Sequence, residues 1–362
     1  MKLYLFITLF LTATISQSDN AKLKQDTHKD YTLIFEDDFS VLNFSKWQHE
    51  ITMDGGGNRE FEYYTNNRSN SFVRDGVLYL KPTFTSDIIG LRAVEKGGTM
   101  DIWGADPGTY CTSQKSDGCF KQSDGVNIIN PITSARIRTT NSFSFKYGRI
   151  EVRAMLPEGD WIWPGIWLRP IHNEYGNWPA SGEIDIVESR GNSPSYPPGG
   201  YNKFGTTLHW GPFPGNDPWS KSHAVWTAST EKDLIENFHT YGFIWNETYM
   251  GSYIDDEKNV VLSLPIDMPF WDLGGWYKNP NLVNPWIGGG KNAPFDKEFY
   301  MLLNVAVGGA CEYFPDGNGK PWTNKDKLAQ KQFWDSRDSW HDSWLGDNTA
   351  MRIDWVKVWG KK

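Results

Sequence analysis

The chain of 362 residues carries 36 basic and 44 acidic side chains, for a formal net charge of -8 at pH 7. The two signs are interspersed without a basic stripe, so nucleic acids are excluded as partners and a neutral ligand fits the balance. Tryptophan is unusually frequent, with 19 copies, while 35 Gly and 20 Pro predict many turns and few long helices.

The N-terminus predicts a secretory signal peptide over residues 1–18. Met1 and Lys2 precede an apolar stretch from Leu3 to Ile15, and small residues follow at positions suited to cleavage. The stretch is shorter than the roughly 20 residues that span a bilayer, and no later segment is apolar enough over that length. We therefore expect a secreted, extracellular protein with no membrane partner. Three sequons for N-linked glycosylation agree with this route. They begin at Asn43, Asn67 and Asn246.

From residue 31 onward, β-type segments follow one another, separated by Gly, Pro, Asn and Asp. The predicted strands cover Tyr31–Asp38, Ser71–Pro82, Phe143–Leu156, Ile184–Glu188, Phe204–Trp210, His239–Asp255, Phe299–Val307 and Met351–Trp359. Only Asn324–Asp338 has helical character, so an α/β alternation has no support and we expect an all-β sandwich. The first and last strands should pair, because both need partners for their backbone groups.

No repeat and no low-complexity linker divides the chain. We therefore expect residues 19–30 to form an N-terminal extension and residues 31–362 to form a single domain. Two polar connections, Ser86–Ile132 and Asp267–Asp296, are too long for hairpin turns. Loops of that length are often functional walls, and we expect them to frame a cleft.

The three cysteines predict one disulfide. Cys111 and Cys119 lie close together in a loop rich in Gly, Ser and Asp, and an oxidising compartment favours a local bridge between them. Cys311 is left in an apolar surrounding, where we expect a buried free thiol.

The segment Gly-Glu-Ile-Asp-Ile-Val-Glu that ends at Glu188 places three carboxylates among β-branched residues, which is costly unless they face water or a ligand. In a regular strand Glu183 and Asp185 share one face, and Glu188 points away. One extra residue within Ile186-Val187 would turn Glu188 onto their face, and such bulges concentrate beside active sites. The spacing alone leaves two other interpretations open, a solvated surface strand and a cation site built from oxygen ligands.

Crowded carboxylates repel each other, so one of them keeps its proton near neutrality and the same residue type supplies an acid and a nucleophile. Retaining glycosidases hold such a pair about 5 to 5.5 Å apart. We assign Glu183 as the nucleophile and Glu188 as the acid that protonates the leaving oxygen and later activates water. Asp185 lies between them and tunes both.

These residues resemble the bulged Glu-x-Asp-x-x-Glu signature of family 16 glycoside hydrolases, in the invertebrate laminarinase-like branch. The resemblance covers nearly the whole chain after the signal peptide. It extends over Gly55–Asn58, Ser134–Ile137, Tyr147–Glu151, Trp163–Trp167, Trp178–Pro179, His209–Gly211, Asn304–Gly309 and Ile353–Val356. The family implies a β-jelly-roll sandwich of two antiparallel sheets with a concave substrate cleft. It also implies a retaining endo-β-1,3-glucanase, or laminarinase.

By the same resemblance, Trp163, Trp167 and Trp178 would line the sugar subsites, where the apolar face of a glucose meets an indole ring. Packing in the core is the alternative for each of them. His209 resembles the family histidine near the leaving-group side. A histidine on a strand is more often structural, but the His-Trp-Gly context favours the functional role here.

Asn58 and Arg149 resemble polar residues that hydrogen-bond to sugar hydroxyls. Glu151 and Arg153 share a strand face with Arg149, so a cross-strand ladder of salt bridges is the alternative for that residue.

No cofactor is required by the retaining route, but Asp354 with main-chain oxygens near Glu36 resembles a structural calcium site of several relatives. The main alternative function is β-1,3-glucan recognition with little or no hydrolysis. The same branch includes immune recognition proteins that have lost the catalytic acids, and Glu183 and Glu188 argue against that assignment. A second alternative is another polysaccharide, such as mixed-linkage glucan, agar or carrageenan. We expect a monomer that binds β-1,3-glucan polysaccharide or oligosaccharide.

Overall fold

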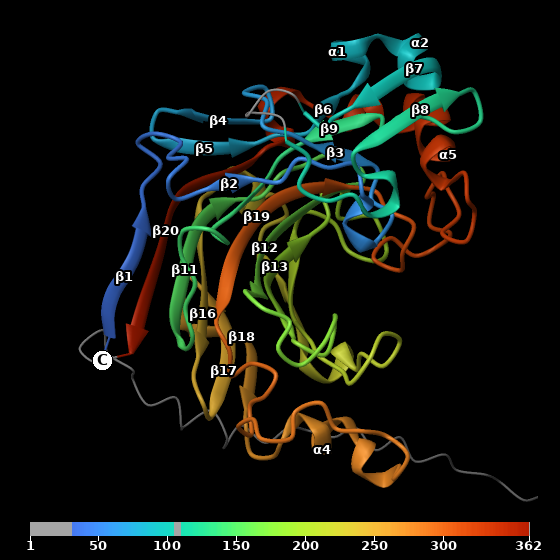
Figure 1. The fold of residues 1–362 in the computed structure, drawn as a ribbon. Coiled ribbons are helices and arrows are strands. Elements are labelled where there is room, and N and C mark those ends of the chain that lie inside the picture. The colour runs from blue at the N-terminus through green and yellow to red at the C-terminus, as the bar shows by residue number, and fades with distance from the viewer. Residues whose placement is uncertain (1–30, 105–109, 362) are drawn as a thin grey trace, which may run out of the picture.

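The computed structural model describes residues 31–104 and 110–361. Two large antiparallel sheets are packed face to face (Figure 1). The eight-stranded back sheet has the order β18-β17-β16-β11-β20-β5-β4, with β1 paired to β20, and the seven-stranded site sheet has the order β15-β14-β13-β12-β19-β10-β2. The all-β sandwich that the sequence predicts is therefore confirmed.

The strands of the back sheet are β1 (Tyr31–Asp37), β4 (Ser71–Arg74), β5 (Val77–Leu80), β11 (Gly148–Met155), β16 (His239–Trp245), β17 (Tyr249–Ile254), β18 (Asp256–Pro265) and β20 (Met351–Lys361). Those of the site sheet are β2 (Gln48–His49), β10 (Arg136–Arg138), β12 (Ile162–Pro170), β13 (Glu183–Ser189), β14 (Lys203–His209), β15 (His223–Thr227) and β19 (Phe299–Val307).

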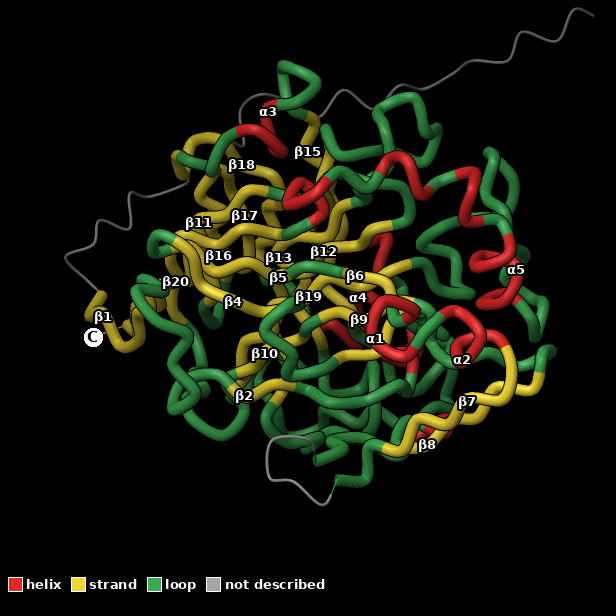
Figure 2. Tube along the Cα trace, turned by 90° about the horizontal axis from the view of Figure 1, so that it is seen from above, coloured by secondary structure: helices red, strands yellow, loops and turns green. Residues whose placement is uncertain are grey.

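Smaller elements are attached to this sandwich. Two minor sheets contain β3 (Glu62–Tyr64), β6 (Thr83–Phe84) and β9 (Ile132–Ser134), and β7 (Lys96–Asp101) and β8 (Phe120–Asp124). The α-helices of the described residues are short: α1 (Ser86–Ile89), α2 (Leu91–Glu95), α3 (Asp233–Glu236), α4 (Phe270–Gly274) and α5 (Ala329–Asp335). Seen from above, α5 and the β7–β8 hairpin lie away from the back sheet, on the other side of the site sheet (Figure 2). No helix in the described ranges is long and apolar enough to cross a membrane.

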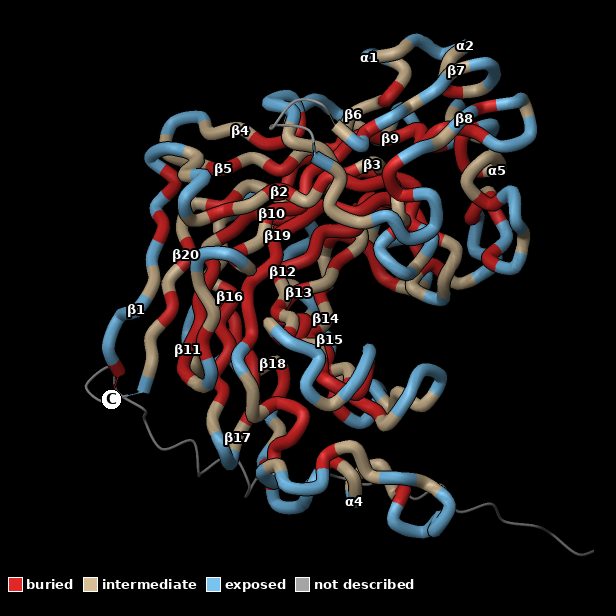
Figure 3. Tube along the Cα trace, in the orientation of Figure 1, coloured by how far each residue is buried: buried red, intermediate tan, exposed pale blue. Residues whose placement is uncertain are grey.

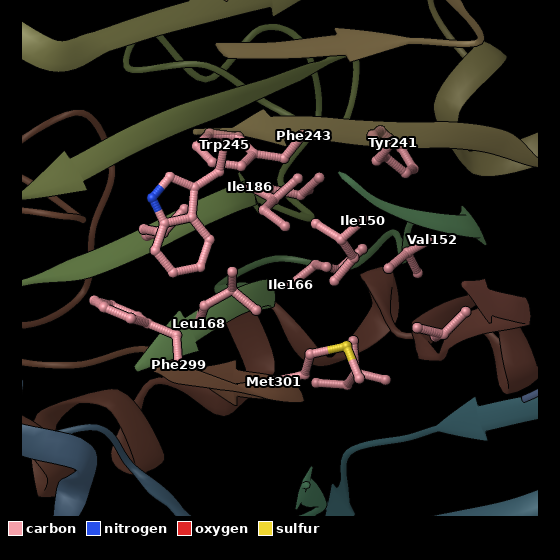
Figure 4. Close-up of a cluster of buried hydrophobic side chains, with 14 of the residues drawn as sticks. Ile150, Val152, Ile166, Leu168, Ile186, Tyr241, Phe243, Trp245, Phe299 and Met301 are labelled. Atoms are coloured by element: carbon pink, nitrogen blue, oxygen red, sulfur yellow. The ribbon is translucent and has the colours of Figure 1, made fainter. Parts of the chain in front are cut away.

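The main hydrophobic core lies between the two large sheets. Ile150 and Val152 of β11 pack in one cluster with Ile166 and Leu168 of β12 (Figure 4), because every second side chain of a strand points to the same face. All four are at most 2% exposed. Truncation of one of them, such as Leu168→Ala, would cost about 2–5 kcal/mol of stability. Burial follows the strands of both sheets, while the connections between them are largely exposed (Figure 3).

Several predicted elements are confirmed with changed boundaries. The first and last strands pair, since Tyr31 lies opposite Lys361 and the ladder continues along β1 and β20. The segment predicted as one strand over Ser71–Pro82 is a hairpin of β4 and β5. Its turn contains Asp75 and Gly76, both at positive φ, which is a common hairpin turn pair.

The segment His239–Asp255 is likewise a hairpin, of β16 and β17, and the helical segment Asn324–Asp338 shortens to α5. The two long polar connections lie at opposite ends of the site-sheet strands (Figure 1). The described part of Ser86–Ile132 carries α1, α2, β7 and β8, and Asp267–Asp296 carries α4.

The cysteine prediction is confirmed for the disulfide and corrected for the free thiol. Cys111 and Cys119 form a disulfide with their Cα atoms 5.6 Å apart. Cys311 is free but only partly buried, not fully buried as expected. Burial raises the pKa of its thiol to about 11. The predicted signal peptide and N-terminal extension lie outside the described residues.

Candidate active site

Strand β13 contains the bulge that the acidic motif predicts. Against β14, Asp185 lies opposite Thr207 and Glu188 lies opposite Gly205. Three steps along β13 therefore match two steps along β14, so β13 holds one extra residue. The register with β12 shifts at the same place, between Asp185 and Val187. This extra residue reverses the alternation of the strand before Glu188.

The bulge separates the acids of β13 from its apolar residues. Ile184, Ile186 and Val187 are at most 1% exposed and belong to the core between the sheets. Figure 4 shows Ile186 among the core side chains. Because Ile186 and Val187 both belong to that core, Glu183 and Glu188 face the opposite side together with Asp185. The sheet thus presents three carboxylates on its outer face.

A histidine connects to this acidic row from the neighbouring strand. His209 lies opposite Glu183 in the ladder between β13 and β14. Its Nε2 atom lies 3.2 Å from Asp185 Oδ2, and its Nδ1 atom lies 2.5 Å from Oδ2 of Asp217. The Trp178 ring, which is 40% exposed, lies 5.7 Å from the imidazole ring. His209 is therefore held between two carboxylates under an open indole ring.

Burial and charge separate the proton affinities of these groups. Burial, and next the charge of Asp185, raise the pKa of Glu188 to about 7, against the opposing effects of His209 and Trp163. Burial also raises the pKa of Glu183, against the opposing charge of His209. Glu188 can therefore hold a proton near neutral pH, as a general acid must.

The other two groups form a charged pair. Burial, and next the charge of Glu183, raise the pKa of Asp185, while the contact with His209 lowers it. Burial alone would lower the pKa of His209, but its contacts with Asp185 and Asp217 raise it well above the ordinary value. The site thus contains an imidazolium among carboxylates near neutral pH.

The three predicted tryptophans lie around the acids in different environments. Trp163 Nε1 donates a hydrogen bond of 3.0 Å to Glu188 Oε1, and its ring stacks on Tyr313 with centroids 3.8 Å apart. Trp163 is only 9% exposed and packs in a second aromatic cluster, and its contact with sugar stays a prediction. The half-buried Trp167 donates 2.6 Å to Asn304 Oδ1. Trp178 remains the open ring of the three.

The structure places Asn58 and Arg149, the two polar residues that the family resemblance assigns to sugar binding, in different parts of the molecule. Asn58 is half-buried and donates from Nδ2 to Glu60 Oε1 at 3.2 Å, and its carbonyl accepts from Ala310. Its contact with sugar stays a prediction.

Arg149 does not belong to this site. It lies on β11 of the back sheet, bonded to Glu151 and Glu257, while its neighbour Ile150 points into the core. The predicted sugar contact of Arg149 at the acidic face is therefore wrong, and the salt-bridge alternative holds.

Sequence reasoning missed a buried polar network beneath Trp167. Asn304 Nδ2 donates 3.1 Å to the Tyr64 hydroxyl, and Arg136 bonds to that hydroxyl and to Glu60. Asn304 is the one polar residue within the buried strand β19, which is the signal that could have revealed it. Asp217 was also missed, since nothing in its loop marks it.

Two sets of side-chain and main-chain donors are candidate metal sites. Glu183, Asp185 and His209 offer ligand atoms within 4.8 Å of one another. Both nitrogens of His209 already face carboxylates, which fits an imidazolium better than a metal ligand.

The donors of the predicted calcium site are engaged by cations. The Glu36 carbonyl accepts from Lys46 Nζ at 2.6 Å, and Asp354 pairs with Arg153. Calcium binding stays a prediction.

Comparison with known proteins identifies related chains. Residues 106–267 match the model of the family described as glycosyl hydrolases family 16. The chain is 47% identical over 337 residues to a β-1,3-glucan-binding protein of Penaeus monodon, covering 90% of each. It is 33% identical over 336 residues to a glucan endo-1,3-β-glucosidase of Cryptopygus antarcticus, covering 92% of this chain and 93% of that one. A β-1,3-glucan-binding protein of Tenebrio molitor is 31% identical, and the chain spans 64% of its length.

The fold has solved counterparts. The laminarinase catalytic domain from Thermotoga maritima aligns with a TM-score of 0.56 and 24% identity, over 92% of this chain and 100% of that one. At that identity the likeness shows the fold, a jelly-roll sandwich of antiparallel sheets.

Proposed function

Because this chain belongs to glycosyl hydrolase family 16, we propose that it is a retaining endo-β-1,3-glucanase, a laminarinase that works by double displacement. The observation that carries the proposal is the bulge in β13, which turns Glu188 to the side of Glu183 and Asp185. A purely structural strand has no need of one buried and two half-buried carboxylates on one face, because each costs desolvation.

In the first step, Glu183 attacks the anomeric carbon of the sugar while the glycosidic C–O bond breaks. Glu188 donates its proton to the departing oxygen, so the leaving chain departs as an alcohol and a covalent glycosyl-enzyme forms on Glu183. The raised pKa of Glu188, about 7, supports the acid role. Glu183 lies opposite His209, whose positive charge favours the ionised form of the nucleophile.

In the second step, Glu188 acts as a base. It takes a proton from water, the water oxygen attacks the anomeric carbon, and the bond to Glu183 breaks. Two inversions give net retention, and both carboxyl groups return to their starting protonation. The hydrogen bond from Trp163 Nε1 to Glu188 Oε1 fixes the orientation of this carboxyl group in both steps. No cofactor enters the route.

The best alternative is a glucan-binding protein that does not hydrolyse. It is favoured by the names of the relatives from Penaeus monodon, at 47% identity, and Tenebrio molitor, at 31% identity. The carboxylates at Glu183 and Glu188, and the difference in their environments, favour hydrolysis. We also propose that the protein is secreted, glycosylated and monomeric, as its sequence predicts.

The test is an assay of the purified protein on laminarin, lichenan and agarose, following reducing ends and the anomeric configuration of the first products by NMR. We expect fragments from laminarin with β configuration. α-Configured first products would reject retention, and laminarin binding without new reducing ends would favour the alternative.

Two variants test the roles of the acids. Glu183→Gln should lower kcat by several powers of ten while laminarin binding is kept, because the nucleophile acts mainly in the transition state. Glu188→Gln should abolish the alkaline limb of the pH profile that Glu188 supplies. Unchanged turnover in Glu183→Gln would reject the assignment of the nucleophile.

A further inference from the structure

The loop after β14 folds back over His209. It runs from Gly211 to Pro218 and returns Asp217 to the start of the loop, where the Trp210 backbone N–H donates 3.2 Å to Asp217 Oδ1. This return requires glycine at position 211, since a Cβ there would lie 1.7 Å from the Asn216 carbonyl oxygen. The close approach of the two backbone segments places the Asp217 carboxylate beside the imidazole.

We infer that Asp217 is a positioning residue that keeps His209 doubly protonated and beside Asp185. A positive charge then lies next to the three carboxylates of β13. This inference rests on the proposed glucanase function. Asp217 Oδ2 accepts from Nδ1 of His209 at 2.5 Å, and Nε2 then points at Asp185 Oδ2, 3.2 Å away. That oxygen is buried and has no hydrogen-bond partner among the described residues, so its contact with His209 is an ion pair.

The chemical reason follows from the two ring nitrogens. A neutral imidazole has one N–H, and with Asp217 as acceptor that proton stays on Nδ1. Nε2 would then turn a lone pair toward Asp185, which disfavours the ionised carboxylate. A second proton on Nε2 removes this conflict, and the two carboxylates together stabilise the resulting cation. Asp217 therefore acts on the catalytic acids through His209.

The charged groups around His209 come from three elements. Strand β13 supplies Glu183, Asp185 and Glu188, and the folded-back loop supplies Asp217. Strand β15 supplies His223, whose pKa is lowered first by burial and then by the charge of His209. Among the described residues, Asp217 is the anionic group outside β13 that contacts His209.

The primary test is Asp217→Asn, which keeps the shape of the side chain and removes its charge. The imidazolium lowers the proton affinity of Glu183, Asp185 and Glu188, so its loss should move the acid limb of kcat/KM on laminarin to higher pH. We expect a shift of about one unit, which is about tenfold in rate at pH values below the limb. The NMR titration midpoint of His209, assigned with His209→Gln, should fall by about one unit or more.

The chain offers a matched control. His239 also lies between two carboxylates, with Nδ1 2.8 Å from Asp255 and Nε2 3.5 Å from Asp233, but on the back sheet. Asp255→Asn makes the same chemical change there and should leave the acid limb and the His209 midpoint unmoved. If Asp217→Asn and Asp255→Asn behave alike in both measurements, the inference is overturned.

A second pair separates charge from packing. Asp217→Glu and Asp217→Gln add the same methylene, so any misfolding affects both, and only the Glu variant should keep a high His209 midpoint and an acid limb near that of the wild type. Equal behaviour of the pair would overturn the inference. If the wild type fails to cleave laminarin, the proposed function fails, while the His209 titrations still decide whether Asp217 sets its protonation.

Discussion

Replacement of Trp163 by phenylalanine would remove one hydrogen bond from the proposed general acid and leave most of its surroundings in place. The indole Nε1 donates 3.0 Å to Glu188 Oε1, and the ring stacks on Tyr313 with an interplanar angle of 6°. Phenylalanine keeps a ring for this stack but has no donor. Since the donor favours the carboxylate form, its loss should raise the pKa of Glu188 above its value of about 7.

The size of the effect follows from the strength of such bonds. A hydrogen bond to a charged group contributes about 1.5–3 kcal/mol, and one pKa unit corresponds to about 1.4 kcal/mol. Water replaces part of the lost bond, so we expect a shift of about one unit. Glu188 must be protonated to act as the acid, and the alkaline limb of the kcat/KM profile on laminarin should therefore move about one unit to higher pH.

A control in the same cluster isolates the hydrogen bond from the packing. Trp161 is also buried beside Phe314, but its indole nitrogen has no hydrogen-bond partner among the described residues. Trp161→Phe and Trp163→Phe should each cost about 1–2 kcal/mol in stability, measured by urea unfolding. Only Trp163→Phe should move the alkaline limb. An unmoved limb in Trp163→Phe, or an equal shift in both variants, would refute the reasoning.

Three further predictions concern the rest of the molecule. Cys111→Ser opens a disulfide with a sequence separation of 8 and should lower stability by about 2.5 kcal/mol, seen as a lower Tm. Burial, and next the charge of Arg68, lower the pKa of His49 to about 3, below the ordinary value of about 6.5. Its neutral form therefore contributes stability that is full above pH 6.5 and is lost toward pH 3, at up to about 1.4 kcal/mol per pH unit. His49→Gln should flatten this slope in urea unfolding between pH 6.5 and 4. Arg149→Ala should leave KM for laminarin within about twofold of the wild type, because Arg149 lies on the back sheet, whereas a large rise in KM would restore it as a sugar ligand.

Strands are predicted correctly from the sequence where burial is continuous. The prediction fails where a strand contains Pro and Gly, or where a tight turn keeps the alternating pattern. Strand β19 coincides with the predicted segment Phe299–Val307, because all nine residues are buried and the apolar run has clear ends. Strand β12 was not predicted as a strand, since Pro164 and Gly165 at its middle argue against a central strand. The two merged hairpins fail for another reason. The period of two continues through a tight turn, so the pattern does not show that the chain reverses.

In the candidate site, too, the features that depend on local spacing could be predicted, and those that depend on contacts between distant segments could not. The bulge follows from local spacing, because Glu188 can join the other acids only if one residue is inserted, and the adjacent Ile186 and Val187 show where. Asp217 could not be predicted, since its contact with His209 depends on a loop returning through space. The predicted sugar contact of Arg149 is wrong because the alternation of side chains along a strand assigns a residue to one face of a sheet. It does not decide which of the two sheets contains the strand. Both outer faces of a sandwich are polar in sequence, and only the strand order, with β11 between β16 and β20, separates the acidic face from the back.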